Sequence, residues 1–365
     1  MLAPAPPLFR LDAHPGPIAA DERAVLIADP GFGRVFTDHM AVVNYSTAQG
    51  WHDARVVARA PLTVDPACAV LHYAQEIFEG LKAYRLHDGG FAMFRPEANA
   101  RRFRDSARRM AMPELPEDLF MASLEALVAA DLDWMPDGPE GALYLRPFMI
   151  ASETFLGVKP ASEYLYMVIA SAAGSYWKGG TRPISLWVSH SYTRAAPGGT
   201  GAAKCGGNYA TSLVAQAEAT ARGCDQVVFL DAAERRWIEE LGGMNIFFVG
   251  ADGSLLTPPL TGTILPGITR DSLVRLARDE GMTVREEPYA IEQWRADAES
   301  GACVEAFACG TAAVVTPIGR VAGPDYGFQI GDGQTGPVTA RLLERLTAIQ
   351  RGRTDDPHGW GHPLG

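Results

Sequence analysis

The sequence predicts a two-domain protein of mixed α/β (α+β) class, and three observations support this. Its 365 residues are more than one hydrophobic core usually supports. Strand-like and helix-like runs occur in both halves, without an internal repeat. The segment Gly174–Pro183, with three glycines and a proline in ten residues, is typical of a linker. We therefore expect an N-terminal arm over residues 1–35, a small α/β domain over 36–173, a linker over 174–183 and a larger domain over 184–365.

The N-terminal half begins with a Pro- and Gly-rich arm that we expect to be extended, and regular elements follow it. Alternating apolar residues predict strands, and apolar residues at helical spacing predict helices. Asp88-Gly89-Gly90 predicts a hairpin turn, and Pro96 suits the first turn of a helix. The expected strands are His39–Ser46, Ala54–Ala60, Leu81–Leu86, Phe91–Arg95, Leu143–Ser152 and Tyr164–Ala173, and the expected helices are Ala69–Gly80, Pro96–Met112 and Glu117–Met135.

The C-terminal half shows the same kind of pattern. A hairpin turn is expected at Asp252-Gly253, and the last dozen residues are expected to be frayed. The expected strands are Ile184–Ser191, Gln226–Leu230, Asn245–Val249, Cys303–Ala308 and Ala312–Pro317, and the expected helices are Tyr209–Arg222, Arg270–Glu280 and Pro337–Arg351.

Composition limits the possible partners. A hydrophobic content of 47% with 21% charged residues is ordinary for a globular protein. The net charge of -11 disfavours nucleic-acid binding. No apolar run reaches membrane-spanning length, and the N-terminus lacks the features of a secretory signal. The five cysteines form no CxxC pair, which favours reduced thiols in the cytoplasm over disulfides or a metal site.

Lys204 is the residue that points most directly to chemistry. It stands in Ala202–Tyr209, where small residues and two glycines leave the backbone uncrowded. An amine at this place could form a Schiff base with an aldehyde such as pyridoxal phosphate. Most lysines in glycine-rich stretches are solvated instead, so the hypothesis depends on the other groups that such a cofactor needs.

A phosphate group needs a fixed anion site, and Leu265–Arg270 leads directly into a predicted helix. The N–H groups at the start of that helix, with Gly267 and the Thr269 hydroxyl, form a natural phosphate site. The alternative is that Thr269 only caps the helix. Gly310–Ala312 offers a second small-residue turn with a hydroxyl group.

A pyridoxal phosphate site also needs a cation near the phosphate and a carboxylate near the ring nitrogen. Arg101, Arg104 and Arg108 share one face of an arginine-rich helix, and composition does not choose among them. The ring nitrogen needs a carboxylate if the ring is to act as an electron sink. Glu239 and Glu240 lie in an apolar, glycine-containing stretch, so one of them could face inward, or both could lie on a surface strand.

Together these segments resemble the class IV pyridoxal phosphate aminotransferases, and most closely the branched-chain amino acid aminotransferases. The likeness runs in order from about residue 36 to the last predicted helix, with family-like spacing. The resemblance implies pyridoxal phosphate fold type IV, with a smaller N-terminal α/β domain, a larger C-terminal domain and pyridoxal 5'-phosphate at their interface. The blocks that carry it are Phe78–Tyr84, Phe94–Pro96 with Asn99, Arg101 and Arg102, Leu145–Pro147, Lys204–Tyr209, Glu240–Phe247, Thr257–Leu260, Leu265–Arg270 and Gly310–Ala312.

By this resemblance, the catalytic residues are Lys204, Tyr209 and Glu240. Lys204 is implied to bind the cofactor and to move a proton between the substrate Cα and C4′ of the cofactor. Glu240 is implied to hold the ring-nitrogen proton, and Tyr209 to hydrogen-bond the ring O3′. The residues implied to bind the phosphate are Arg101, Gly267, Ile268, Thr269 and Thr311.

The resemblance also implies an apolar substrate pocket with a polar anchor. Arg146 would accept the distal carboxylate of glutamate, and we expect it to have tyrosine neighbours because an unpaired buried arginine is costly. Leu156 and Val158 resemble a loop that reaches over from the partner subunit of a homodimer. Ordinary core packing is the alternative for each aromatic residue. The implied substrate-binding residues are Tyr73, Phe78, Tyr144, Arg146, Tyr176, Met244, Thr311 and Ala312.

The implied reaction is reversible transfer of the amino group between L-leucine, L-isoleucine or L-valine and 2-oxoglutarate, with ping-pong kinetics and no metal. The alternatives are a D-amino acid transaminase, an aminodeoxychorismate lyase and, more remotely, a non-catalytic pyridoxal phosphate-binding protein. Length and the block Phe78–Tyr84 favour the branched-chain group. Mammalian relatives carry a redox CxxC where this chain has Ala313 and Thr316, so we expect no thiol switch there. Gly243 stands where some relatives have a threonine.

Overall fold

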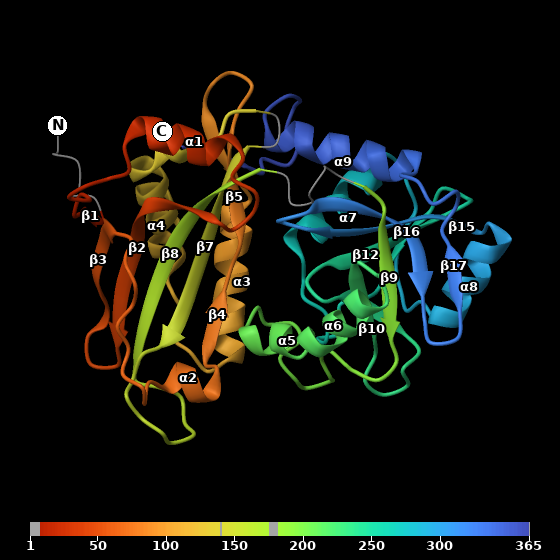
Figure 1. Ribbon diagram of the computed structural model, residues 1–365, viewed down its shortest axis with the longest axis horizontal. Coiled ribbons are helices and arrows are strands. Elements are labelled where there is room, and N and C mark those ends of the chain that lie inside the picture. The colour runs from red at the N-terminus through yellow and green to blue at the C-terminus, as the bar shows by residue number, and fades with distance from the viewer. Residues whose placement is uncertain (1–7, 139–140, 175–181, 365) are drawn as a thin grey trace. The chain divides into compact units, whose positions relative to one another are not determined.

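The computed structural model describes residues 8–138, 141–174 and 182–364, and the chain forms two compact units. The first unit comprises Met1–Tyr176 and Gln350–Gly365, and the second comprises Trp177–Ile349. Each unit combines helices with a nine-stranded sheet, which confirms the predicted mixed α/β class (Figure 1). Most of the predicted linker, residues 174–183, lies outside the described residues.

The sheet of the first unit is largely antiparallel. Its strand order is β1-β3-β2-β8-β7-β5-β6-β18, and β4 also pairs with β7. The predicted hairpin is confirmed, because β5 and β6 pair antiparallel around residues 86–90. The strands are β1 (Arg10–Leu11), β2 (Val35–Ser46), β3 (Gly50–Ala58), β4 (Glu76–Phe78), β5 (Leu81–Arg85), β6 (Phe91–Phe94), β7 (Ala142–Ala151), β8 (Glu163–Ala173) and β18 (Gly361–Leu364).

Two helices of this unit pack together against its sheet (Figure 1). α4 contacts β2, β3 and β8, and α3 contacts α4 and β4. The aromatic rings of Phe103, Phe120 and Tyr166 meet edge to face or tilted at this layer. The helices are α1 (Ala20–Ala28), α2 (Ala69–Tyr73), α3 (Pro96–Arg109), α4 (Glu117–Ala130) and the short 3-10 helix η1 (Leu132–Trp134).

The helix predicted over residues 69–80 is wrong beyond Tyr73. Ala74 adopts a left-handed conformation with φ 47°, which ends α2. The chain then becomes β4, which pairs antiparallel with β7. Residues 76–78 therefore form a strand despite their helical apolar spacing, because they pair with residues some seventy positions later in the sequence.

Both ends of the chain are more regular than predicted. The N-terminal arm contains α1, so the expected extended conformation is wrong for residues 20–28. Residues 361–364 form β18, which pairs with β6, so the expected fraying is wrong for this segment. Because this segment belongs to the first unit, the predicted domain boundary needs correction, and the two units are of similar size.

The sheet of the second unit mixes parallel and antiparallel pairs. Its order is β11-β10-β9-β16-β15-β12-β13-β14, and β17 pairs with β16. β9 runs parallel to both of its neighbours, β10 and β16. The strands are β9 (Ile184–Ser189), β10 (Gln226–Leu230), β11 (Ile238–Leu241), β12 (Asn245–Gly250), β13 (Leu255–Thr257), β14 (Val284–Glu286), β15 (Cys303–Gly310), β16 (Val314–Ala322) and β17 (Gly327–Gln329).

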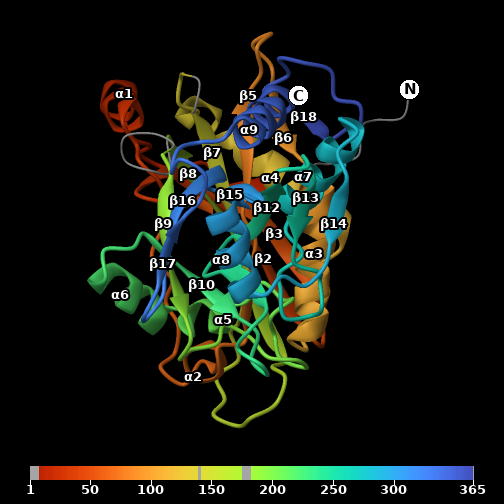
Figure 2. The same cartoon turned by 90° about the vertical axis from the view of Figure 1, so that its right-hand side faces the viewer.

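Helices pack against the strands of this second sheet (Figure 2). α6 contacts β9 and β10, α7 contacts β14 and β15, and α8 contacts β15 and β17. The buried ring of Trp294, on α8, packs edge to face against Phe248 and Phe328. The helix predicted over 209–222 is split into α5 and α6. The helices are α5 (Gly206–Ala210), α6 (Leu213–Ala221), α7 (Ile268–Asp279), α8 (Ile291–Ser300) and α9 (Pro337–Gln350).

A search of the described residues finds no helix with the length and apolar character needed to cross a bilayer.

Candidate active site

Lys204 and Tyr209 are brought together at the start of α5. Lys204 lies two residues before the helix and is half-buried, and Tyr209 lies in its only full turn. The Lys204 Nζ donates a hydrogen bond of 2.8 Å to the Tyr209 Oη. Two of the three predicted catalytic residues therefore form one direct contact.

Asn208 holds the segment that carries Lys204. Its buried side-chain amide donates to the carbonyl oxygens of Thr200 and Ala203, at 2.8 and 2.7 Å. The Thr200 hydroxyl donates back to the Asn208 Oδ1 at 2.7 Å. These three bonds tie residues 200–203 to α5, so the position of Lys204 does not depend on its own side chain.

Glu240 lies on β11 and is only 2% exposed. Its Oε1 accepts the Leu265 N–H at 2.9 Å, and its Oε2 accepts from the Asn245 Nδ2 at 3.3 Å. Burial raises the pKa of Glu240 to about 7, while the charges of Arg194 and, to a smaller degree, Lys204 act in the opposite direction. Glu240 is thus a buried carboxyl group that can gain or lose its charge near neutral pH.

Glu239 is also buried, so a surface strand carrying two solvated acids is excluded. It accepts a 2.5 Å hydrogen bond from the Thr263 hydroxyl, and burial raises the pKa of its carboxyl group. Because successive side chains of a strand point to opposite faces, Glu239 and Glu240 occupy different environments.

Arg194 is a site residue that the sequence reasoning missed. Its Nη1 lies 2.8 Å from the Glu240 Oε1, and both side chains are almost completely buried. It comes from the loop after β9, ten residues before Lys204. An arginine in a loop of polar and small residues is normally solvated, so the sequence offers no signal for this contact.

Gly267 is the N-cap of α7, and its lack of a side chain has a visible reason. A Cβ placed there would lie 2.0 Å from the Asn245 Oδ1, the same residue whose Nδ2 contacts Glu240. Thr269 is the second residue of α7 and is buried, so the reading of Thr269 as the helix cap is wrong. The first-turn N–H groups of an α-helix have no acceptors within the helix, which is the geometry that suits an anion.

The turns after β11 and β15 meet beside Tyr209. A Cβ at Gly243 would lie 3.6 Å from the Tyr209 ring, and one at Gly310 would lie 3.5 Å from the Met244 Cγ. Thr311 and Ala312 follow Gly310 directly and are half-buried. The second unit therefore brings the turns that carry Met244, Thr311 and Ala312 close to the helix of Tyr209.

Arg146 forms the centre of a cluster in the first unit. Its Nη2 donates to the Tyr144 Oη at 3.0 Å, and its guanidinium carbon lies 4.8 Å from the centre of the Phe78 ring. The prediction that Arg146 has a tyrosine neighbour is confirmed. Phe32, from the N-terminal arm, packs edge to face on Tyr144 and was not predicted. Tyr144 also requires Gly80, since a Cβ there would lie 2.0 Å from the Tyr144 hydroxyl.

Tyr73 and the loop of residues 154–159 form a second group in the first unit. The Tyr73 hydroxyl donates to the backbone carbonyl of Leu156. Leu156 and Val158 are 60% and 88% exposed, which is unusual for large apolar side chains. Tyr176, the remaining predicted aromatic residue, lies outside the described residues.

Arg101 is exposed on α3, whereas its neighbours are engaged. Arg104 and Arg108 form ion pairs with Glu117 and Glu114. Arg102 is buried and pairs with Glu79, while within the described residues Arg101 has no ion-pair partner. Arg101 is thus the arginine of its helix face that remains available to a ligand.

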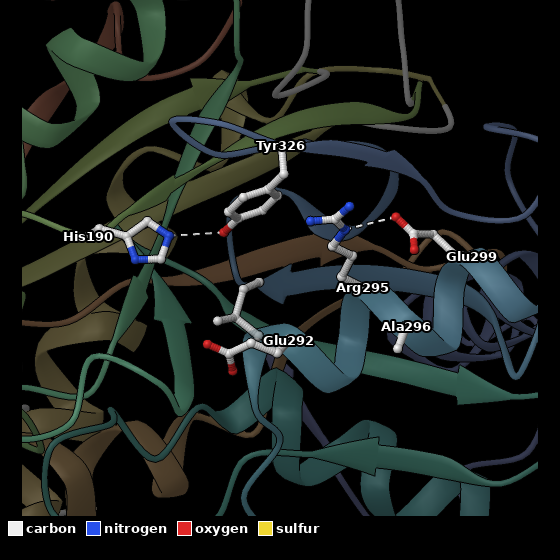
Figure 3. A pocket seen from close by; sticks show the side chains of 7 residues that line it. His190, Glu292, Arg295, Ala296, Glu299 and Tyr326 are labelled. Atoms are coloured by element: carbon white, nitrogen blue, oxygen red, sulfur yellow. Dashed lines mark hydrogen bonds and ion pairs between the residues drawn. The ribbon is translucent and has the colours of Figure 1, made fainter.

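A cavity of about 320 Å³ elsewhere in the second unit does not belong to this site (Figure 3). None of the predicted residues lines it. Its polar contacts are a 3.0 Å hydrogen bond between the His190 Nε2 and the Tyr326 hydroxyl and the exposed ion pair Arg295–Glu299. The candidate active site is centred on Lys204, Tyr209 and Glu240.

Comparison with known proteins identifies the family. The family model described as amino-transferase class IV matches residues 76–321. A probable branched-chain-amino-acid aminotransferase of Streptomyces coelicolor is 56% identical over 98% of this chain and 99% of its own length. The branched-chain-amino-acid aminotransferase of Mycobacterium tuberculosis is 57% identical, with 96% of each chain covered.

Solved structures show the same fold. The branched-chain amino acid aminotransferase from Escherichia coli superposes with a TM-score of 0.73 at 32% identity, covering 90% of this chain and 99% of that one. The branched-chain aminotransferase from the archaeon Thermoproteus uzoniensis, with norvaline, gives 0.74 at 29% identity, with 90% and 100% covered. The chain belongs to the class IV aminotransferase family, and its fold is that of these enzymes.

Proposed function

We propose that this aminotransferase is a branched-chain amino acid aminotransferase that uses pyridoxal 5'-phosphate. It exchanges the amino group between L-leucine, L-isoleucine or L-valine and 2-oxoglutarate in a reversible ping-pong reaction. The observation that carries the proposal is the Lys204–Tyr209 hydrogen bond in the same unit as a buried, ionisable Glu240. The names of the relatives support the substrate class.

The residues of the second unit fit this cofactor. Glu240 has one oxygen engaged by Arg194 and Leu265, while its Oε2 accepts a single long hydrogen bond from Asn245 and retains accepting capacity. That oxygen would hold the proton of the ring nitrogen. The start of α7, where Gly267 leaves no room for a Cβ, would hold the phosphate with Ile268, Thr269 and Thr311.

Lys204 is the base in this proposal. Pyridoxal phosphate, when bound, supplies an aldehyde for the amino group and a ring that accepts the electrons left on Cα. The Lys204 Nζ, in its neutral form, takes the proton from the substrate Cα and later releases it. The Tyr209 Oη accepts from that Nζ and fixes its direction. A second substrate, a 2-oxo acid, uses the same groups in reverse order.

The first unit would supply the specificity for both kinds of substrate. The apolar faces of Phe78 and Tyr144 suit a branched side chain, and Arg146 between them would accept the distal carboxylate of glutamate. A solved branched-chain amino acid aminotransferase complexed with N-(5'-phosphopyridoxyl)-L-glutamate is consistent with such a dual pocket. Arg101 would bind phosphate, and Tyr73, Tyr176, Met244, Thr311 and Ala312 would contact the substrate.

We also propose that the enzyme is a homodimer that acts in the cytoplasm. The exposure of Leu156 and Val158 supports a partner that covers them. All five cysteines are free and buried, which is in keeping with a reducing compartment.

The first experiment is the visible spectrum of the purified, cofactor-loaded protein before and after addition of L-leucine alone. The proposal expects the cofactor band to shift on adding leucine and to return on adding 2-oxoglutarate. A band that ignores leucine but responds to D-alanine or to aminodeoxychorismate would replace the substrate by that of a D-amino acid transaminase or of the lyase. A protein that takes up the cofactor and responds to none of these would be a non-catalytic binding protein.

A further inference from the structure

Arg194 is a buried charged residue that forms an ion pair with Glu240. It is 4% exposed, and its Nη1 contacts the Glu240 Oε1 at 2.8 Å. Taking two charges out of water usually costs as much as their attraction returns, and well-packed apolar residues often serve stability equally well. A buried arginine at this place therefore calls for a role other than stability.

The backbone and side chain of Arg194 are held from two directions. The Thr211 hydroxyl, just after α5, donates to the Arg194 carbonyl at 3.1 Å. The Arg194 Nη1 donates to the Thr263 carbonyl at 3.3 Å. Arg194 is thus held at its backbone by the residue after the helix that carries Tyr209, and at its guanidinium group by the segment that leads to Leu265.

The charges around Glu240 come from several elements. Arg194 and Lys204, on the loop before α5, are positive, and Glu239 on β11 is negative. Glu239 in turn lies near Asp231, and Cys309 on β15 lies near both Glu240 and Arg270 of α7. Burial raises the pKa of the Cys309 thiol, so this group stays neutral. Among these groups, Arg194 is the cation in direct contact with the carboxylate.

We propose that Arg194 is a positioning residue that favours the ionised form of Glu240 and occupies its Oε1, so that Oε2 is left for the ring nitrogen of the cofactor. This inference rests on the proposed function. Without the guanidinium group, burial and Glu239 would both favour the protonated carboxyl. A protonated Glu240 has no charge with which to keep the ring nitrogen protonated, and the ring would be a poorer electron sink.

The test is the titration of Glu240 in the cofactor-free protein. Infrared difference spectra against Glu240→Gln follow the carboxylic acid band of this one residue as a function of pH. In the wild type the band should disappear on raising the pH through about 7. In Arg194→Met its midpoint should rise by about 1–3 pH units, the usual effect of losing an opposite charge in contact.

Two further variants separate charge from packing. Arg194→Lys keeps the charge and should lie between wild type and Arg194→Met. Arg270→Met removes another buried arginine, which contacts Glu286 and the Pro258 carbonyl, and should leave the Glu240 midpoint unchanged. An Arg194→Met midpoint equal to that of wild type would overturn the inference, and so would an equal shift in all three variants.

The titration of Glu240 can be read whether or not the branched-chain substrate assignment holds. A wild type that fails to convert leucine would remove the branched-chain assignment, yet the titration would still decide whether Arg194 controls Glu240. In the loaded enzyme, the leucine half-reaction of Arg194→Met should recover as the pH is raised through the shifted midpoint. A loss that is the same at every pH would contradict the assigned role.

Discussion

Two buried carboxylates, one in each unit, are paired with arginine in different ways. Glu79, in the first unit, is fully buried and accepts two hydrogen bonds from the Arg102 guanidinium, at 2.7 and 2.8 Å. The Asn99 amide and the Gly80 N–H add two more, at 2.7 and 3.2 Å. Glu240, in the second unit, has Arg194 on one oxygen and a single 3.3 Å bond on the other.

The two pairs differ in how fully the carboxylate is hydrogen-bonded, and this difference distinguishes a structural ion pair from one whose carboxylate can still accept a ligand proton. Glu79 has donors on both oxygens in a paired geometry, so it locks the strand segment after β4 to α3. Glu240 keeps accepting capacity on one oxygen, and burial brings its pKa to about 7. A buried carboxyl group with spare capacity is the one expected to take part in binding or chemistry.

The largest expected effect is on the rate. Glu240→Gln keeps the shape of the side chain but removes its charge, so the leucine half-reaction should slow by about 100–1,000-fold while the cofactor still binds. Single-turnover absorbance measurements give this rate. The matched variant Glu79→Gln should leave the rate per folded molecule near that of wild type. An equal loss of half-reaction rate in both variants would show that Glu240 has no catalytic role that Glu79 lacks.

The reverse contrast is expected for stability. Arg102→Met leaves Glu79 charged and buried without its partner, which should lower the free energy of unfolding by about 3–5 kcal/mol. Urea unfolding of the cofactor-free protein measures this. The control is Arg104→Met on the same helix, whose partly exposed ion pair with Glu117 should contribute less than about 1 kcal/mol. Similar values for the two variants would mean that the Glu79 pair is not structural.

Stability should also depend on pH through Glu240. Its folded pKa of about 7 lies above the ordinary value of 4.5, so between these two pH values the folded protein binds a proton that the unfolded chain has released. Stability from this group is therefore present at low pH and is lost as pH rises from 4.5 to about 7. Relative to Glu240→Gln, the cofactor-free wild type should lose up to about 3 kcal/mol across that window. A pH-independent difference in urea unfolding would contradict the raised pKa.

A smaller effect is expected at two glycines of the second unit. Gly267→Ala forces a Cβ against the Asn245 Oδ1, and the strain should cost about 1–3 kcal/mol, which corresponds to about 5- to 150-fold weaker cofactor binding. Gly243→Ala is the matched control, because its Cβ would meet the Tyr209 ring at an ordinary 3.6 Å. Fluorescence titration of the cofactor-free variants compares them. Equal affinities would show that the start of α7 does not hold the phosphate.

The smallest effect is expected from thiol oxidants. Burial raises the pKa of Cys303 to about 12 and also that of Cys309, so neither thiol is readily ionised for oxidation. Activity after hydrogen peroxide treatment and quenching should stay near that of untreated enzyme. A loss that dithiothreitol reverses would point to Cys205 beside Lys204, and Cys205→Ser would then remove it.

Several local elements were readable from the sequence. The β5–β6 hairpin follows from its Asp-Gly-Gly turn, and α7 with its N-terminal glycine follows from helical spacing. The Lys204–Tyr209 hydrogen bond spans only five residues, but it was not predicted, and the role of Tyr209 came from the family resemblance. The roles of Glu240 and Arg101 came from the family resemblance, since composition left Glu239 and the other arginines as equal candidates.

Tertiary structure decided the rest, because it depends on partners that are distant in the sequence. β18 pairs with β6 across more than 260 residues, and no local pattern in the last residues predicts this pairing. Arg194 reaches Glu240 across 46 positions, and Phe32 reaches Tyr144 across 112. Whether a charged side chain is solvated or buried depends on which strands and loops surround it. The sequence by itself indicated the family and a candidate Schiff-base lysine, and only the folded chain placed Arg194 and Asn245 against the Glu240 carboxylate.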